Sequence, residues 1–208
     1  MSLTFGLYER FLLPRLIDAA CGSKDIDEQR GKVVPRAKGA VLEIGVGPGH
    51  NLAHYRDDQV DRLWALEPAA EMIALAKKRA APDLGVEFLE SGAEEIPLDD
   101  ASVDTVVLTY TLCTIPDTSA ALREMHRVLR PDGQMLFCEH GRSPDASVHR
   151  WQRRIEPLWK RIGGGCHLTR DVPELLGDHG FAIDELDTAY LPGPRPMTWN
   201  TWGRAAKS

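Results

Sequence analysis

A short apolar run that ends in a glycine-rich turn constrains the fold of this chain more than any other feature. Residues 41–45 (VLEIG) have the character of a buried strand, and Val46, Gly47, Pro48 and Gly49 follow directly. Glycine adopts backbone angles that a Cβ atom forbids, and it lets the backbone approach a ligand closely. A strand that ends in such a turn indicates an α/β sheet with a nucleotide-type cofactor beside its first strand.

The rest of the chain alternates strand-like and helix-like segments, a pattern that builds a parallel sheet with helices on both faces. The expected strands are 41–45, 62–68, 86–90, 104–112, 134–140, 182–190 and 198–206. The expected helices are 70–80, 119–129, 146–162 and 171–180, and the glycine-rich turn should also lead into a helix. The turn-forming sequence from Arg130 to Gly133 should stop the second of these helices.

The length and charge of the chain limit its organisation and its partners. A chain of 208 residues is close to the size of one domain, so we expect a single domain over residues 1–208. Its expected parts are an N-terminal helical lid at 1–39, a cofactor-binding core at 40–140, and acceptor-side helices with the last strands at 141–208. The formal net charge of -6 argues against nucleic acid as a partner.

The spacing of the glycines and the acidic residue before them select the cofactor. A dinucleotide site would have its third glycine at position 50, but His50 occupies that position and the glycines are Gly45, Gly47 and Gly49. Glu43 lies two residues before the first glycine, and its carboxylate would repel a pyrophosphate. The same carboxylate suits a cofactor with a positively charged amino-acid end and no phosphate. The pattern therefore favours S-adenosylmethionine over NAD.

Acidic residues after the next two strands extend this prediction. Glu67 ends the second expected strand 22 residues after Gly45, where a carboxylate can accept hydrogen bonds from both ribose hydroxyls. NAD sites use the same arrangement, so Glu67 alone does not separate the two cofactors. The polar loop 91–97 follows the third strand and can contact the adenine edge. The alternative for Glu94 and Glu95 is a solvated acidic turn.

Several segments together resemble a known family. VLEIGVGPG, ALEP, SGAEEIPL, DTVVLTYTL and LREMHRVLRPDGQMLF are similar, in order and spacing, to the motifs of class I S-adenosylmethionine-dependent methyltransferases of the methyltransferase type 11 group. The resemblance covers residues 40–140 and implies a Rossmann-like, seven-stranded, mainly parallel sheet whose last strand is antiparallel. It also implies that the three glycines line the methionine portion and that Thr109 lies beside the sulfonium. Glu67 would hold the ribose, and Ala93 and Glu94 would meet the adenine.

With these roles included, the cofactor-binding residues that we expect are Tyr8, Glu43, Gly45, Gly47, Gly49, Asn51, Glu67, Pro68, Ala93, Glu94, Thr109 and Leu112.

The second half of the chain resembles a narrower group. LCTI (112–115), MLFCEHGRS (135–143), WQRRIEPLWKRIGGGCHLTR (151–170) and the ending TWGRAAK are similar to the microsomal alkyl thiol methyltransferase-like family. This resemblance implies a small-molecule acceptor such as a thiol. The membrane anchor of that family has no counterpart here, so we expect no stable membrane insertion. Several small bacterial relatives share this pattern without the anchor.

Few residues are needed for catalysis, because a sulfonium cofactor supplies its own leaving group and the protein mainly aligns the reactants. We expect no metal site, since Cys21, Cys113, Cys138 and Cys166 are far apart and form no C-x-x-C pair. We interpret them as reduced thiols of a cytoplasmic protein, with Cys166 either a pocket wall, a reactive thiol or a small buried hydrophobe. His140 and His167 are the candidates to accept a proton or orient an acceptor. The alternative for each is a surface or capping histidine.

Residues 142–170 combine seven Lys or Arg with only two acidic residues. An apolar stripe at helical spacing accompanies these charges and consists of Trp151, Ile155, Leu158, Trp159 and Ile162. Three interpretations remain open: a helix packed on the sheet edge, a substrate lid, or a contact with a membrane surface. We expect this segment and the N-terminal helix to recognise the acceptor.

Three functional hypotheses follow. The leading one is a small-molecule methyltransferase that acts on a thiol or a similar soft nucleophile. The alternatives are a phospholipid or protein methyltransferase, and a non-catalytic module that binds S-adenosylmethionine. The sequence leaves the acceptor and the oligomeric state open.

Overall fold

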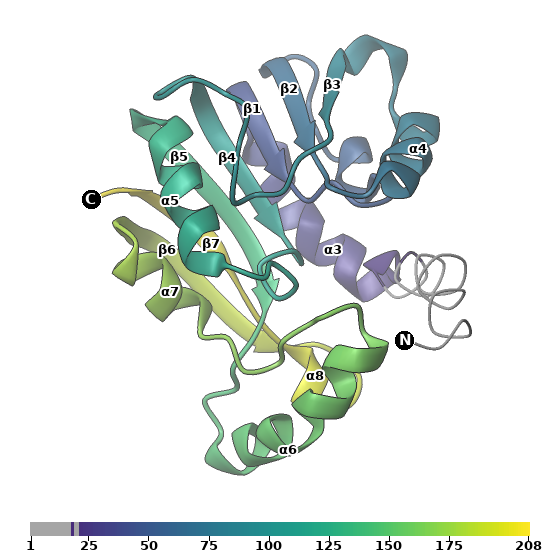
Figure 1. The fold of residues 1–208 in the computed structure, drawn as a ribbon, viewed down its shortest axis with the longest axis vertical. Helices are drawn as coiled ribbons and strands as arrows, with labels where there is room; N and C mark the ends of the chain where they lie inside the picture. Colours follow the sequence, from purple (N-terminus) through teal and green to yellow (C-terminus); the bar gives the residue numbers. More distant parts are fainter. Residues whose placement is uncertain (1–17, 19–20) are drawn as a thin grey trace.

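A seven-stranded sheet forms the centre of the computed structural model, which describes Asp18 and residues 21–208 (Figure 1). The strands are β1 (Gly39–Ile44), β2 (Val60–Leu66), β3 (Val86–Leu89), β4 (Val103–Thr109), β5 (Leu129–His140), β6 (Phe181–Tyr190) and β7 (Trp199–Lys207). Their order in the sheet is β3-β2-β1-β4-β5-β7-β6. β7 runs antiparallel to β5 and β6, whereas β1 to β5 pair in parallel. The predicted Rossmann-like sheet with an antiparallel last strand is confirmed.

Helices cover both faces of this sheet. The described helices are α3 (Lys24–Val33), α4 (Ala70–Arg79), α5 (Thr118–Val128), α6 (Ala146–Ile162), α7 (Val172–Asp178) and α8 (Arg195–Thr198). Short 3-10 helices lie at η2 (Val34–Arg36), η3 (His50–Ala53) and η4 (Pro82–Leu84). The predicted helices 70–80, 119–129, 146–162 and 171–180 correspond to α4, α5, α6 and α7.

Each face of the sheet packs into its own hydrophobic core, so the apolar strands are buried on both sides. Leu42 and Ile44 of β1 join a cluster with α5 and α7, whereas Val41 joins a cluster on the opposite face with α3 and α4. Alternate residues of a strand point to opposite faces, so a strand covered on both sides is apolar at nearly every position. Each fully buried Leu or Ile side chain stabilises the folded state by about 1.5–3 kcal/mol relative to an exposed one. The exception in β1 is Glu43, which is buried and polar.

Three local predictions were wrong. β4 ends at Thr109 rather than at residue 112, because Tyr110 has a φ of 52° and leaves the extended conformation. β5 begins at Leu129 rather than at residue 134: α5 ends at Val128, close to the predicted end, but the residues from Arg130 to Gly133 lie within β5 as a bulge, since Leu129 pairs with Val103 and Gln134 pairs with Thr105. The glycine-rich turn is followed by η3, a four-residue 3-10 helix, and not by an α-helix.

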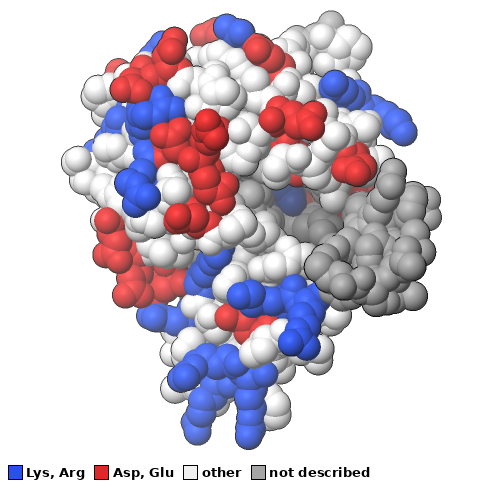
Figure 2. All heavy atoms as spheres, viewed as in Figure 1, with Lys and Arg blue, Asp and Glu red and all other residues white. Residues whose placement is uncertain are grey.

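α6 lies at the end of the molecule remote from α4, and Lys and Arg side chains gather on that part of the surface (Figures 1 and 2). Its apolar stripe is not packed as one face: Trp151 and Leu158 are 57% and 65% exposed. The buried side chains of α6 are Val148 and Gln152, and the amide of Gln152 donates to the carbonyl groups of Gly141 and Pro196. Among the described helices, none combines the length and the apolar character that crossing a bilayer requires.

Candidate functional site

The three glycines after β1 have positive φ angles of 66°, 52° and 90°, but for different structural reasons. A Cβ atom on Gly45 would lie 2.3 Å from the methyl group of Thr111, and one on Gly49 would lie 3.0 Å from Ala76. A Cβ atom on Gly47 would have only one neighbour within 4 Å, the carbonyl oxygen of Gly45 at 4.0 Å. Gly45 and Gly49 therefore permit close packing of the turn, whereas the backbone at Gly47 is open to a ligand.

The Glu67 side chain, just after β2, forms hydrogen bonds with the glycine turn after β1 and with the backbone just before α4. Its Oε2 accepts a hydrogen bond from the Gly47 N–H at 3.0 Å, and its Oε1 accepts one from the Ala69 N–H at 3.1 Å. Burial raises the pKa of the half-buried carboxyl group. Each oxygen keeps a further lone pair for a ligand hydroxyl. Pro68, the next residue, is exposed.

A buried polar network lies beside the same turn. The Glu43 carboxylate is 1% exposed and accepts hydrogen bonds from Asn51 Nδ2 and from the Tyr55 hydroxyl, both at 2.9 Å. Asn51 Nδ2 also donates to Thr109 Oγ1 at 2.9 Å. Burial raises the pKa of Glu43 to about 7.

Arg30 of α3 completes this network, and the sequence analysis missed it. One guanidinium nitrogen donates to Asn51 Oδ1 and to Thr109 Oγ1, both at 2.8 Å. The side chain is 6% exposed, and its Nε is buried without a hydrogen-bond partner in the described part of the chain. An arginine in a polar helix gives no sequence signal of burial. Together with Glu43, the unpartnered N–H fits the zwitterionic end of an amino acid.

The loop after β4 is held by Glu139 of β5. Its Oε1 accepts hydrogen bonds from the N–H groups of Thr111 and Leu112, at 2.8 and 3.1 Å. Its Oε2 is buried and has no partner among the described residues, and burial raises the pKa of the carboxyl group to about 7. The Leu112 side chain is fully buried in the core that contains α5. Leu112 therefore fixes the loop through packing.

The loop predicted to meet the adenine is tied to the start of α5. Glu94 Oε1 accepts a hydrogen bond from the Asp117 N–H at 3.2 Å, whereas Glu95 is exposed. Ala93 is 7% exposed and packs in the core. Tyr8 lies outside the described residues.

An apolar pocket of about 490 Å³ lies where β4 and β5 end, between the start of α3 and the end of α6. Its apolar wall includes Ile26, Trp159, Leu168, Leu191, Pro192 and Met197. Tyr110 and His140 also line it. His167 is not among its described lining residues, because its Nδ1 lies 3.6 Å from the Glu156 carboxylate and its backbone N–H donates to the Cys113 carbonyl.

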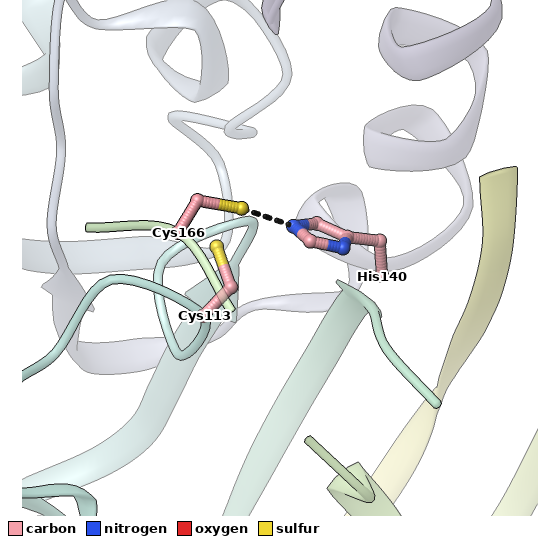
Figure 3. Close-up of side chains that lie close together, drawn as sticks. All are labelled: Cys113, His140 and Cys166. Carbon is pink, nitrogen blue, oxygen red and sulfur yellow. Dashed lines mark hydrogen bonds between the residues drawn. The ribbon is translucent and has the colours of Figure 1, made fainter. Parts of the chain in front are cut away.

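Two thiols and one imidazole meet at the wall of the apolar pocket (Figure 3). Cys113 follows β4, His140 ends β5 and Cys166 follows α6. His140 Nε2 lies 3.3 Å from Cys166 Sγ, and the ligating atoms of all three residues lie within 4.8 Å of one another. A hydrogen bond from Cys113, together with His140, lowers the pKa of Cys166. The sequence did not reveal this cluster because its members are far apart along the chain.

Comparisons with known proteins identify relatives of this chain. Residues 42–137 match the family described as a methyltransferase domain. Thiol S-methyltransferase TMT1B of Homo sapiens is 32% identical over 82% of this chain and 69% of its own length. The protein of that name from Mus musculus is 35% identical over 85% of this chain and 69% of its own length. This chain therefore spans about two thirds of their length.

A solved structure supports the fold independently. It is a Thermotoga maritima protein described as an S-adenosylmethionine-dependent methyltransferase and possible histamine N-methyltransferase. The two structures superpose with a TM-score of 0.68 at 21% identity, over 98% of this chain and 100% of the other. At this identity the likeness concerns the fold and not the substrate.

Proposed function

The chain belongs to the class I S-adenosylmethionine-dependent methyltransferases, and we propose that it transfers the methyl group to a small thiol held in the apolar pocket. The observation that carries this proposal is the position of the pocket. Tyr110 and Cys113 line it and follow Thr109, which belongs to the polar network beside the glycine turn. An acceptor in the pocket would therefore lie next to the cofactor. Relatives named thiol S-methyltransferases support the choice of a thiol.

The residues around the glycine turn fit S-adenosylmethionine. When bound, this cofactor supplies a methyl group on a positively charged sulfur whose leaving group is a neutral thioether. Glu67 would accept hydrogen bonds from the ribose hydroxyls, and the open backbone at Gly47 leaves room for the methionine portion. Glu43 and the unpartnered Nε of Arg30 would bind the amino and carboxylate groups.

The apolar pocket suits a small acceptor in size and composition. Its volume of about 490 Å³ lies within the range of small-molecule sites, which are mainly apolar with a few polar groups. A thiolate is a good nucleophile near neutral pH, so the pocket mainly needs to exclude water and align the sulfur with the methyl group. His140 is one of the polar residues that line the pocket, and its imidazole can help to orient the thiol.

A second candidate concerns the exposed face of α6. Trp151 and Leu158 are exposed to solvent, and Trp151 lies beside Arg150, Arg153 and Arg154, a combination that favours contact with an anionic lipid surface. This contact would bring apolar thiols to the enzyme, and it would also serve a phospholipid methyltransferase. A protein methyltransferase would need an open groove for a peptide instead.

Two tryptophans on α6 provide matched variants. Trp159 lines the apolar pocket, whereas Trp151 is exposed to solvent and is not among the residues that line it. With labelled S-adenosylmethionine and a panel of thiols, amines and lipids, thiols should be the best acceptors. Trp159→Ala should lower kcat and kcat/KM for the thiol at unchanged cofactor affinity, and Trp151→Ala should act as the parent does. Methylation of amines or lipids in preference to thiols would refute the proposal, as would equal loss in both variants.

A further inference from the structure

We propose that Cys113, His140 and Cys166 bind a soft divalent cation, Zn²⁺, and leave one coordination position open to the apolar pocket. The cation site stands on the geometry of the three side chains. The role of its open position rests on the proposed thiol acceptor, whose sulfur would be the fourth ligand.

The distances between the three ligating atoms suit a tetrahedral site. Zinc binds sulfur at about 2.3 Å and imidazole nitrogen at about 2.0–2.1 Å, so neighbouring ligands of a tetrahedral ion lie about 3.5–3.8 Å apart. His140 Nε2 and Cys166 Sγ are 3.3 Å apart, and no pair within the cluster exceeds 4.8 Å. Side-chain movements of about 1 Å or less would complete the geometry.

Hydrogen bonds hold the three segments that carry the ligands in place. The Cys113 carbonyl accepts a hydrogen bond from the His167 N–H at 2.8 Å, which joins the loop after β4 to the loop after α6. Arg170 donates to the Leu112 carbonyl and, at 2.7 Å, to the Ile115 carbonyl, so it fixes the loop on both sides of Cys113. His140 pairs with Asn200 of β7. The site is therefore largely formed before an ion arrives.

The chemistry of the ligands selects the ion. Thiolates and imidazole bind Zn²⁺ and exclude Mg²⁺ and Ca²⁺, which require oxygen ligands. All four cysteines are free of disulfides. Within the described residues no fourth Cys, His, Asp or Glu joins the cluster, and three protein ligands with an open position are typical of catalytic zinc. Cys21 lines the same pocket but lies outside the cluster.

The open position gives the pocket a means of activating its acceptor. A thiol that coordinates to a divalent cation loses its proton, which here would pass to solvent, and remains as a bound thiolate. The apolar wall would meanwhile hold the organic part of the acceptor. The pocket would thus select sulfur nucleophiles over amines or alcohols of the same shape.

Metal titration of the reduced, chelator-treated chain tests the proposal without methyl transfer. Co²⁺ serves as the spectroscopic probe, and Zn²⁺ should displace it at one ion per chain. Cys113→Ser, Cys166→Ser and His140→Ala should each weaken binding by at least about 100-fold, since even outer-shell changes cost 10–100-fold. Cys138→Ser makes the same change outside the cluster and should bind as the parent does. Adding a small thiol to the Co²⁺-loaded chain should alter the thiolate-to-cobalt absorption.

Cofactor titration of every variant distinguishes a lost metal site from a lost fold, and from failure of the proposed function. Each variant should bind S-adenosylmethionine as the parent does, because the cofactor residues lie outside the cluster. The metal site is refuted if the parent binds no ion, or if the cysteine variants of the cluster bind it as Cys138→Ser does. If Cys21→Ser lost metal affinity to the same degree, the ion would have four protein ligands and no open position. An absorption spectrum of the Co²⁺-loaded chain that does not change when the thiol is added would indicate the same. Either result would overturn the open position.

Discussion

Replacing Glu43 with glutamine should change how the stability of the protein depends on pH. The carboxyl group is 1% exposed, and burial raises its pKa from 4.5 to about 7. In the unfolded chain the same group titrates near its ordinary value. Between these two pKa values the folded protein holds a proton that the unfolded chain has released. The free energy of unfolding therefore falls as the pH rises through this window.

The size of the effect follows from the difference between the two pKa values. One unit of difference corresponds to about 1.4 kcal/mol, so Glu43 should lower the free energy of unfolding by about 2.5 kcal/mol between pH 5 and pH 8. Glutamine does not ionise and should lack this loss. At pH 5 the variant should be less stable than the parent by about 0.5–1.5 kcal/mol, the value of one hydrogen bond from Asn51 or Tyr55.

Urea unfolding of parent and variant across this pH range measures the effect. The variant should overtake the parent in stability as the pH rises, and saturating cofactor should reduce the pH dependence of the parent, because a positively charged amino group favours the carboxylate. Tyr55→Phe removes a hydrogen bond that lowers the pKa of Glu43, so it should move the parent's loss of stability to higher pH. Stability curves of parent and Glu43→Gln that run parallel from pH 5 to pH 8 would refute this reasoning.

Three further substitutions test the cofactor site by calorimetry. Glu67→Gln should weaken S-adenosylmethionine binding by about 1.5–3 kcal/mol, the range for hydrogen bonds to a charged group. Unchanged affinity would show that Glu67 does not bind the ribose. Gly47→Val should abolish binding, because the side chain enters the open space above the turn and also strains a backbone whose φ is 52°, while the circular dichroism spectrum stays that of the parent. Arg30→Gln should abolish the preference for S-adenosylmethionine over its decarboxylated analogue, and a retained preference would place the carboxylate elsewhere.

The sequence predicted the sheet well because the hydrophobic periodicity, the turn-forming residues and the apolar runs all indicate the same elements along the chain. The glycine turn, the apolar strands and the helices α4 to α7 each have a local signal, and local signals are sufficient for element type and order. The end of β4 was missed because Tyr110 adopts a left-handed backbone conformation that tyrosine itself does not predict. Its hydroxyl donates to Asn200 of β7 at 2.7 Å, a contact distant in sequence that accompanies the bend.

The site was predicted less completely, since it depends on contacts between distant segments. Glu43, Gly47 and Glu67 stand at strand ends, where position in the sequence indicates position in space. Arg30 comes from a helix whose composition is that of an exposed surface, and only the fold brings it to Thr109. The cluster at the apolar pocket likewise joins three segments that no spacing rule connects.

The buried ionisable groups link the two halves of the site. Burying a carboxylate without a full set of hydrogen-bond partners lowers the stability of the fold. Glu139 is such a case, because its Oε2 is buried and unpartnered among the described residues, and packing of the core does not require a carboxylate there. Its other oxygen accepts hydrogen bonds from the N–H groups of Thr111 and Leu112, two residues and one residue before Cys113. This loop starts beside Thr109 of the buried polar network and ends in the wall of the apolar pocket. The fixed loop therefore explains why Glu139 is buried: it sets the distance between the buried polar network and the apolar pocket.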